Sequence, residues 1–274
     1  MTISNRLEGK VALVTGAGRA GNIGVAVCEA FLMAGARAVI ATDIHPDPDG
    51  TTANRLCEQF DQSSFRVESH DVTSPGDWAR LVALIESEYG GLDVLVNNAG
   101  VSSSGGVAST PLEEMRRVMA VNSDGVFLGM QHCMPLLAQA AERFAGGGSI
   151  INTLSMSSYM ANAHNIAYHA SKASARMLTL CAATEFGPLK VRVNSVHPGV
   201  THTPLLSEGL AQYVARGVWA DEDEAERSIA SMSPLGVSSQ PESTAHAFVY
   251  LASEEARFVT GASIYHDGGL GQRY

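Results

Sequence analysis

The chain has 274 residues, of which 45% are hydrophobic and 17% charged, so it can bury a large core and disorder is excluded. Its formal net charge of -10 at pH 7 argues against nucleic acid or an anionic membrane as the main partner. We therefore expect small molecules and copies of the same chain as partners. Residues 1–10 are polar, and no stretch approaches the about 18 apolar residues of a membrane span, so neither a signal peptide nor a span is expected.

The cysteines Cys28, Cys57, Cys133 and Cys181 are scattered along the chain, without a Cys-x-x-Cys pair. Two of them lie in apolar helical patterns, where a buried thiol is expected. This distribution indicates a reducing compartment, and we expect a cytoplasmic protein.

Strand and helix patterns alternate from the first residues onward. In chain order we expect a strand at Val11–Thr15, a helix at Ile23–Met33 that stops at Gly35, strands at Ala38–Asp43, 65–70 and 92–97, a helical stretch over 115–144 broken near Asn122, a strand at 149–155, a helix at Ile166–Phe186 and a strand at 191–196. Such alternation predicts one α/β domain over 1–274, a doubly wound parallel sheet with helices on both faces. Ligands bind such sheets beyond the carboxyl ends of the strands.

The first expected strand opens into a glycine-rich turn. Residues 15–24 read Thr-Gly-Ala-Gly-Arg-Ala-Gly-Asn-Ile-Gly and lead into a helix, whose amino-terminal amides and dipole can hold a pyrophosphate. Turns also carry glycine for backbone reasons alone, so the motif needs its context. The expected cofactor contacts in this turn are Gly16, Arg19, Asn22, Ile23 and Gly24.

Asp43 closes the second expected strand, nineteen residues after Gly24. A carboxylate there can accept hydrogen bonds from an adenosine ribose and would repel a 2′-phosphate, so NAD is preferred over NADP. Arg19 is the dissenting residue, because a guanidinium can pair with a phosphate, although it can equally reach the pyrophosphate or solvent.

Residues 168–172 read Tyr-His-Ala-Ser-Lys, and Ser155 lies thirteen residues before Tyr168. Tyr168 and Lys172 are four apart and share one face of the expected helix, so the ammonium favours the phenolate and lowers the pKa of Tyr168 from about 10. A chance surface pair would show the same spacing, so the neighbouring segments must support the pattern. Hydroxyl, phenol and ammonium can meet one carbonyl oxygen here, which points to hydride-transfer chemistry.

Seven segments follow one another along the chain: the glycine-rich turn, Asp71-Val72, Asn97-Asn98-Ala99-Gly100, Asn122 in Val-Asn-Ser-Asp-Gly, Ser155, Tyr168 with Lys172, and Pro198-Gly199. In this set and order the chain resembles the short-chain dehydrogenase/reductase family over nearly its whole length. The resemblance implies a single-domain Rossmann-like fold and interconversion of an alcohol and a carbonyl with NAD(P). It also implies a homotetramer, formed through the helices at 115–144 and Ile166–Phe186.

The resemblance also implies a role for each matching position. Tyr168 would protonate or deprotonate the substrate oxygen, Ser155 would hydrogen-bond that oxygen, and Lys172 would bind the nicotinamide ribose and lower the pKa of Tyr168. Asn122 would hold a water that links Lys172 to solvent. The other cofactor contacts would be Asp71 and Val72 at the adenine, Asn98 with Ala99 and Gly100 in the cleft, and Thr201 and Thr203, after Pro198 and Gly199, near the carboxamide and phosphates.

Several of these residues also have plain structural explanations. Asn122 can cap or kink a helix, and Asn98 can satisfy backbone groups at a strand end. Ser157 and Ser158 have the wrong offset from Tyr168, and we expect them to cap or solvate the loop. His164, His169 and His197 lie near the expected site without metal-ligand spacing, so no metal is expected.

The glycine-rich turn departs from the family pattern Thr-Gly-x-x-x-Gly-x-Gly. Gly16 and Gly24 are two residues further apart, and Asn22, preceded by Gly21, stands at the middle glycine. Asparagine tolerates left-handed backbone angles and Gly21 adds freedom, so we expect cofactor binding to survive.

Substrate choice is expected in a lid at about 203–235. Apolar side chains in this segment and after Ser155 suggest a pocket for a bulky secondary alcohol or ketone, although packing between two short helices explains them equally well. These side chains are Leu205, Leu206, Leu210, Tyr213, Val214 and Trp219, with Met156, Tyr159 and Met160 after the serine. The acidic run at 221–224 is typical of a solvated helix start.

Three functions agree with these patterns. The leading one is an NAD-dependent dehydrogenase of an apolar alicyclic, aromatic or steroid-like secondary alcohol. A 3-oxoacyl thioester reductase is an alternative, but it would favour NADPH and a basic patch for an acidic carrier protein, which Asp43 and the net charge oppose. A non-catalytic NAD-binding sensor would be expected to have lost a member of the catalytic set, and Asn122, Ser155, Tyr168 and Lys172 are all present.

Overall fold

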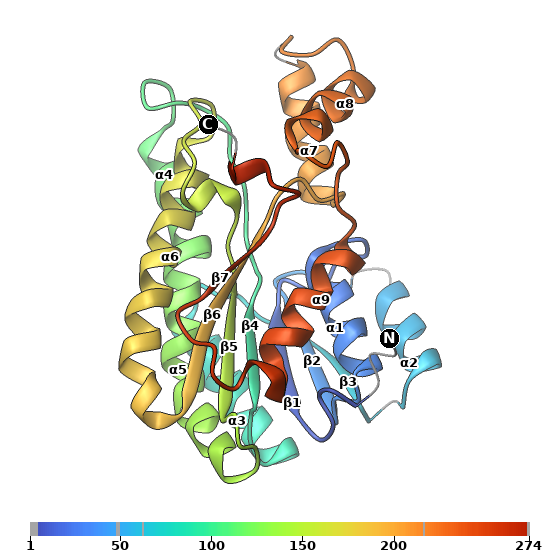
Figure 1. Ribbon diagram of the computed structural model, residues 1–274, viewed down its shortest axis with the longest axis vertical. Helices are drawn as coiled ribbons and strands as arrows, with labels where there is room; N and C mark the ends of the chain where they lie inside the picture. The colour runs from blue at the N-terminus through green and yellow to red at the C-terminus, as the bar shows by residue number, and fades with distance from the viewer. Residues whose placement is uncertain (1–4, 48–49, 62, 216, 273–274) are drawn as a thin grey trace.

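Seven parallel strands form one sheet in the computed structural model, which describes residues 5–47, 50–61, 63–215 and 217–272 (Figure 1). The order is β3-β2-β1-β4-β5-β6-β7, and every neighbouring pair is parallel. The strands are β1 (Val11–Thr15), β2 (Ala38–Asp43), β3 (Phe65–Ser69), β4 (Val94–Asn97), β5 (Gly148–Thr153), β6 (Val191–Pro198) and β7 (Ser263–His266). The order reverses between β1 and β4, which creates a crevice at their carboxyl ends.

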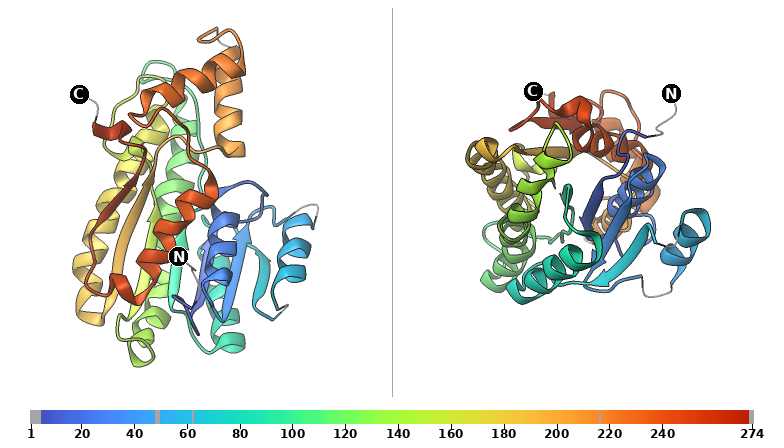
Figure 2. Two further views of the ribbon diagram at one scale, coloured as in Figure 1. Left: turned by 45° about the vertical axis from the view of Figure 1, so that its right-hand side comes forward. Right: turned by 90° about the horizontal axis from the view of Figure 1, so that it is seen from below.

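Helices cover both faces of the sheet, which is why the central strands are almost continuously apolar. Along β1, Val11 and Leu13 enter one core cluster while Ala12 and Val14 enter the other. One face is covered by α1 (Ile23–Met33), α2 (Thr51–Gln59) and α9 (Pro241–Ala252), and the other by α3 (Pro75–Tyr89), α5 (Gly125–Gln139) and α6 (Ile166–Phe186), as Figures 1 and 2 show.

The doubly wound parallel sheet expected from the sequence is confirmed. The helices Ile23–Met33 and Ile166–Phe186 have the expected bounds, and the strands expected at 65–70, 92–97, 149–155 and 191–196 differ by one or two residues at their ends. The break near Asn122 is a π-helical segment, Ala120–Asp124, between α4 (Leu112–Met119) and α5. The wider spacing of a π-turn explains why the helical pattern changes phase there.

Two helices stand beyond the carboxyl ends of the strands, at the top of Figure 1. They are α7 (Pro204–Ala215) and α8 (Glu222–Met232), within the segment expected to form a lid. A small core of their own holds them together, with Leu210, Ala225 and Ile229 buried. Asp221 caps α8 by accepting from Glu224 N at 2.8 Å, so the acidic run is the helix start expected from the sequence.

Charged side chains link neighbouring segments at the opposite end of the sheet, where the strands begin. Asp93 is only 2% exposed; its carboxylate accepts from Val11 N at 2.8 Å and pairs with the Arg143 guanidinium at 2.7 Å. Nearby, the buried Lys10 ammonium pairs with Glu254 at 3.0 Å. These contacts join β1, β4 and the segment after α9 far from the carboxyl-end crevice.

Replacing Asp93 by alanine should lower the free energy of unfolding by about 2 kcal/mol, because the buried N–H of Val11 loses its acceptor and Arg143 its partner. Urea denaturation measures the change. Glu255→Ala is the control, since it breaks the exposed ion pair with Arg6 and should cost less than about 1 kcal/mol. Equal losses in the two variants would show that burial of the carboxylate is unimportant.

Candidate active site

Ser155, Tyr168 and Lys172 meet at the carboxyl end of β5. Ser155 follows the strand, and the other two residues lie on the first turns of α6. The Ser155 side chain lies close enough to the Tyr168 hydroxyl to lower its pKa, and Lys172 Nζ lies 5.7 Å from the centroid of the Tyr168 ring. Lys172 is 3% exposed and donates to the carbonyl of Thr153 at 2.8 Å. The structure thus brings together the hydroxyl, phenol and ammonium.

The pKa of Tyr168 differs from the sequence prediction. Burial raises it above the ordinary value of 10, and the hydrogen bond with Ser155 offsets only part of that rise. Burial also lowers the pKa of Lys172 to about 8, because the ammonium loses hydration. The prediction that Lys172 holds the pKa of Tyr168 below 10 is therefore wrong for this structure, since desolvation of the phenol dominates.

Asn122 lies in the same cluster, fully buried in the π-helical segment. Its amide accepts from Val101 N and donates to Val101 O, both at 2.9 Å, and donates to Ser171 Oγ at 3.0 Å. A Cβ added at Gly100 would lie 3.4 Å from Asn122 Oδ1 and 3.6 Å from Lys172 Nζ. The side chain of Asn122 therefore clamps the loop after β4 beside the lysine.

The glycine-rich turn packs directly against the end of β4. Gly16 has a φ of +65°, and a Cβ there would lie 2.5 Å from Ala99 Cα. A Cβ at Gly24 would lie 2.5 Å from Gly16 O. Asn98 Nδ2 donates to Gly16 O at 2.9 Å and to Thr15 O at 3.0 Å. Asn98 thus donates to backbone carbonyls at the end of β1, in agreement with the structural explanation given from the sequence. These hydrogen bonds hold the turn in place beside the crevice.

Asn22 does not adopt the left-handed backbone angles for which the sequence allowed. Its φ of -92° is extended, and the left-handed residue is Gly21, with a φ of +77°. Asn22 caps α1, because its Oδ1 accepts from Val25 N at 2.8 Å, and its Nδ2 donates to Gly16 O at 3.0 Å. The lengthened turn is therefore closed by an asparagine cap, and Ile23 begins the helix directly after it.

Asp43 and Arg19 lie on either side of the same turn. Asp43 Oδ2 accepts from Gly18 N at 3.0 Å, and its Oδ1 accepts from His45 N at 3.1 Å. Arg19 points to α7, where its guanidinium pairs with Glu208 at 2.5 Å. Both side chains of this pair are more than half exposed. Among the described residues, Arg19 therefore forms its ion pair with a carboxylate of α7.

The remaining expected cofactor residues follow β3 and β6. After β3, Asp71 Oδ1 accepts from the amide and hydroxyl of Thr73 at 2.9 and 2.8 Å, and Val72 is buried. After Pro198, the last residue of β6, Gly199 leaves no room for a side chain, because a Cβ would lie 2.7 Å from Asp267 Cα.

Thr201 and Thr203 differ in what their hydroxyls contact. Thr201 is 5% exposed, and its Oγ1 has no hydrogen-bond partner among the described residues. Thr203 Oγ1 accepts from Leu206 N at 3.2 Å, at the start of α7. The buried Oγ1 of Thr153 at the end of β5 is likewise without a partner among the described side chains and backbone.

These features fit a dinucleotide. The turn after β1 packs so closely that only glycines can occupy three of its positions, Gly16, Gly18 and Gly24, and it begins a helix at the point where strand order reverses. Asp43 stands at the end of the neighbouring strand, and the unpartnered hydroxyls of Thr153 and Thr201 lie at the ends of β5 and β6. Each of these groups lies at the carboxyl ends of the strands, where such cofactors bind.

The apolar residues expected to form a substrate pocket divide into two groups. Leu206, Leu210, Val214 and Trp219 pack in the core between α7 and α8, which is the helix-packing explanation. Tyr213 instead makes an edge-to-face contact with His164, at a ring-centroid distance of 6.4 Å, and lies 5.7 Å from the Trp219 ring. Leu205 is 40% and Tyr159 36% exposed. The residues free to line a pocket are fewer than the sequence suggested.

Sequence reasoning missed a buried polar cluster behind Ser155. Ser158 was expected to cap or solvate the loop, but Ser155 forms the cap; the Ser158 side chain is buried, donates to Ser155 O at 2.8 Å and contacts His197 at 3.0 Å. The signal in the sequence was a histidine directly before Pro198. His169 Nδ1 contacts the carbonyl of Asn165 at 2.8 Å, as a helix residue. In the described parts of the chain, no three His, Cys, Asp or Glu side chains are placed to hold a metal ion.

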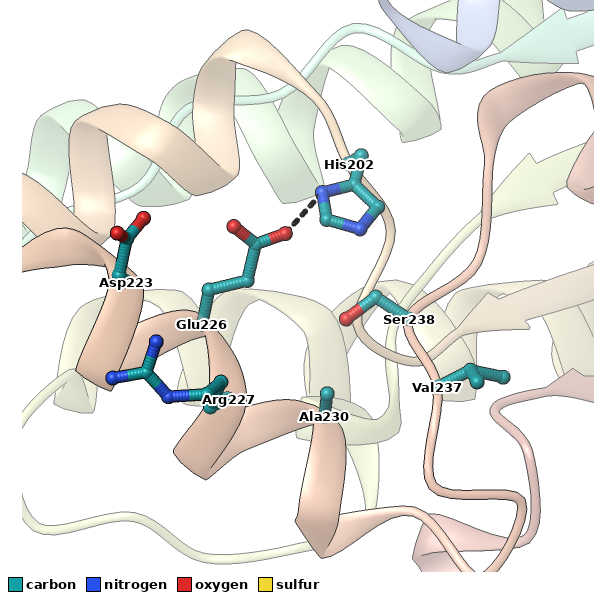
Figure 3. Close-up of a pocket in the computed structure, with 7 residues that line it drawn as sticks. All are labelled: His202, Asp223, Glu226, Arg227, Ala230, Val237 and Ser238. Atoms are coloured by element: carbon teal, nitrogen blue, oxygen red, sulfur yellow. Dashed lines mark ion pairs between the residues drawn. The ribbon is translucent and has the colours of Figure 1, made fainter.

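A hollow of about 390 Å³ lies between α8, His202 and the segment that follows α8 (Figure 3). It is lined by His202, Asp223, Glu226, Arg227, Ala230, Val237 and Ser238. His202 Nδ1 and Glu226 face each other across it at 2.9 Å. None of Ser155, Tyr168 and Lys172 lines it, so it is separate from the cluster at β5. No helix within the described ranges is long and apolar enough to cross a bilayer.

The fold and the site define a nicotinamide-dependent oxidoreductase: a doubly wound sheet, a glycine-rich turn at its crevice, and a Ser-Tyr-Lys cluster beside it. A family model described as enoyl-(acyl carrier protein) reductase matches residues 16–271. The chain belongs to the short-chain dehydrogenase/reductase family. It therefore acts on an alcohol or ketone as a small-molecule substrate.

Known relatives extend over almost the whole chain. The NADP-dependent (R)-specific alcohol dehydrogenase of Lentilactobacillus kefiri is 36% identical over 269 residues, covering 97% of this chain and 98% of that protein. The 3-alpha-(or 20-beta)-hydroxysteroid dehydrogenase of Mycobacterium tuberculosis is 35% identical over 267 residues, covering 97% and 91%. A solved structure from Burkholderia xenovorans, described as a short-chain dehydrogenase/reductase, has a TM-score of 0.88 at 33% identity and covers 99% and 100%.

Proposed function

We propose that this protein is an NAD-dependent dehydrogenase of an apolar secondary alcohol, of alicyclic, aromatic or steroid-like shape. The observation that carries the proposal is the contact of Ser155, Tyr168 and Lys172 at the end of β5. The hydroxyl of Ser155 acts on the phenol of Tyr168, and the ammonium is buried beside them. Such a set can hold a carbonyl or alcohol oxygen and move a proton at that oxygen.

Each side chain has one task in the proposed reaction. Bound NAD supplies the hydride acceptor. Tyr168 takes the proton from the substrate hydroxyl, or returns it to the carbonyl in the reverse direction, and Ser155 orients that oxygen. Lys172 places positive charge beside the ring of Tyr168, although burial still holds the pKa of the phenol above its ordinary value. Asn122 holds the loop after β4 beside Lys172. This position supports its proposed role of holding a water that links Lys172 to solvent.

The proposal assigns cofactor contacts to residues at the carboxyl ends of six strands, β1 to β6. They are Gly16, Arg19, Asn22, Ile23, Gly24, Asp43, Asp71, Val72, Asn98, Ala99, Gly100, Tyr168, Lys172, Pro198, Gly199, Thr201 and Thr203. The close packing of Gly16 against Ala99 supports the turn as a site where backbone approaches phosphate. The unpartnered Thr201 hydroxyl supports a ligand at the end of β6.

Asp43 and Glu208 support NAD over NADP. The carboxylate of Asp43 stands at the end of β2, where an adenosine ribose binds in this class of fold, and its charge opposes a 2′-phosphate. Arg19 already has a carboxylate partner in Glu208. The Lentilactobacillus kefiri relative is NADP-dependent, so cofactor choice varies among the relatives of this chain.

The alternatives have less support. A 3-oxoacyl thioester reductase that serves an acidic carrier protein calls for a basic surface, which a net charge of -10 opposes. A non-catalytic sensor has no need of a buried ammonium beside a tyrosine. The aromatic contact between His164 and Tyr213, which joins the loop before α6 to α7, favours an apolar substrate at this face.

The lid at about 203–235, the assembly and the location are further parts of the proposal. The lid is supported by the separate core of α7 and α8. A homotetramer through α4, α5 and α6 is supported by Phe127 and Met177, which are 45% and 56% exposed on α5 and α6. Free thiols at Cys28, Cys133 and Cys181 support a cytoplasmic location; the side chain of Cys57 lies outside the described part of the chain.

The test is NADH formation by the purified protein across secondary alcohols graded from small aliphatic through alicyclic and aryl to steroid, with NAD and separately with NADP. We expect NAD-linked turnover, with kcat/KM rising toward the bulky apolar alcohols. Absorbance at the NADH band measures it. Turnover with NADP alone would reject the argument from Asp43, and failure of every alcohol with both cofactors would reject the dehydrogenase.

Asp43→Asn is the matched variant, because it removes the charge and keeps an acceptor for Gly18 N. We expect the ratio of kcat/KM for NADP over NAD to rise about tenfold or more, since one repelling charge is lost. An unchanged ratio would place cofactor choice elsewhere.

A further inference from the structure

His197 lies directly behind the turn that carries Ser155. It is near the end of β6, and its side chain is completely buried. The imidazole Nδ1 is 3.2 Å from Ser155 O and 3.0 Å from Ser158 Oγ, and Nε2 is 2.9 Å from Ser195 Oγ. Both ring nitrogens therefore have partners, one on the Ser155 turn and one on β6 itself.

The carbonyl of Ser155 is held by three donors. Ser158 donates to it from its amide at 3.0 Å and from its hydroxyl at 2.8 Å, and His197 Nδ1 is the third group. A carbonyl oxygen can only accept, so a hydrogen bond from the ring to Ser155 O requires the proton on Nδ1, and Nε2 then accepts from the Ser195 hydroxyl. In the other tautomer Nδ1 would accept from the Ser158 hydroxyl and the bond to Ser155 O would be lost.

The surroundings keep this imidazole neutral. Burial lowers the pKa of His197 to about 4, and the charged groups that act on it are Lys172 and Arg176 on α6 and Asp267 after β7. The rings of Tyr159 and Tyr265 lie 5.8 and 4.9 Å from it. Because the ring does not titrate near neutral pH, it acts as a fixed hydrogen-bond donor.

We propose that His197 is a positioning residue that fixes the carbonyl of Ser155 through Nδ1 and thereby aims the Ser155 hydroxyl at Tyr168. The backbone of Ser155 is fully extended, with φ -171° and ψ 162°, and its Oγ accepts from Ser157 N at 3.1 Å. Turning the carbonyl would therefore move the hydroxyl that bonds Tyr168. A shift of about 1 Å in a reacting group can cost about 10²-fold in rate. This inference rests on the proposed function of Ser155 and Tyr168.

Two substitutions of His197 by an amide residue distinguish the roles of the two ring nitrogens. Asparagine at 197 keeps a donor at the position of Nδ1, while glutamine reaches the position of Nε2. We expect His197→Gln to lower kcat about tenfold with little change in KM, and His197→Asn to keep kcat within about threefold. Steady-state kinetics on the best alcohol of the panel measure both. Equal losses in the two variants, or a larger loss in His197→Asn, would overturn the proposal.

A pH profile adds a readout that mere loosening of the fold would not move. The hydrogen bond from Ser155 lowers the pKa of Tyr168, so its loss in His197→Gln should raise the apparent pKa seen in kcat/KM. His197→Asn should leave that pKa in place. Thr179→Val is the control for stability, because it removes a buried hydrogen bond to Asn152 and does not contact Ser155. Thr179→Val should lower Tm and leave the pH profile of kcat/KM unchanged. If its profile shifts as in His197→Gln, the shift in His197→Gln is explained by a general loss of stability and the proposal fails.

The tautomer of His197 can be measured without turnover. In the ¹⁵N spectrum of the histidine-labelled protein, the signals that vanish in His197→Asn should belong to an imidazole protonated at Nδ1. Protonation at Nε2 would overturn the proposal even in an active enzyme. If no alcohol of the panel is oxidised, the proposed function fails. An imidazole protonated at Nδ1 would still support the hydrogen bond from His197 to the carbonyl of Ser155.

Discussion

Replacement of Tyr168 by phenylalanine is expected to lower kcat by about 10³-fold. The substitution keeps the ring beside the buried Lys172 ammonium and removes the hydroxyl that faces Ser155. Without it, the cluster has no group to exchange a proton with the substrate oxygen. Steady-state oxidation of an active alcohol gives kcat, and NADH fluorescence shows that the nucleotide still binds.

Tyr89→Phe is the matched control, since Tyr89 ends α3 shortly before β4 begins, at the end of the sheet opposite to the Ser155 cluster. It loses a hydroxyl in the same way and should keep the rate of the parent. A Tyr168→Phe protein as fast as its parent would show that the proposed proton transfer is wrong, whichever substrate the enzyme accepts.

Acid should destabilise the protein well above the range in which most carboxylates titrate. Burial lowers the pKa of His70 and of His197 from 6.5 to about 4. Between these values the unfolded chain binds more protons than the folded one, so stability is complete above pH 6.5 and falls as the pH drops toward 4. Each imidazole accounts for about 3 kcal/mol over the full window. Urea denaturation at pH 7 and at pH 4.5 measures most of this loss.

Asparagine variants assign the loss to its sources. His70→Asn keeps a donor near the Thr42 hydroxyl, which contacts His70 Nδ1 at 3.0 Å, and should remove about half of the pH dependence. His246 is exposed on α9, and His246→Asn should leave the slope as it is. The same slope in His70→Asn as in the parent would mean that this ring is protonated in the folded protein.

The sequence was sufficient for the parts of the fold that local patterns determine. The apolar run of β1 and the bounds of α1 and α6 follow from burial on both faces and from the helical period, and the order of motifs placed Ser155, Tyr168 and Lys172 together. The phase change at Asn122 was also visible, although its form, a π-helical segment, was not.

The features that were missed depend on residues far apart in the chain. Arg19 pairs with Glu208 across 189 positions, and only the placement of α7 brings the two together. The pKa of Tyr168 was predicted from one neighbour four residues away, whereas burial by the whole site decides its direction. The cap formed by Asn22 is local by contrast, but the count of glycines does not reveal where the turn enters α1.

The buried charge pairs lie where the strands begin, and the proposed chemistry lies where they end. Asp93 with Arg143 and Lys10 with Glu254 stabilise the sheet where the strands begin. The helices α7 and α8 have a small core of their own beyond the carboxyl ends of the strands. Contacts that are well separated contribute nearly additively. Substitutions in α7 and α8 therefore leave the charge pairs at the start of the strands intact, so this part of the chain can diverge in evolution without endangering the scaffold.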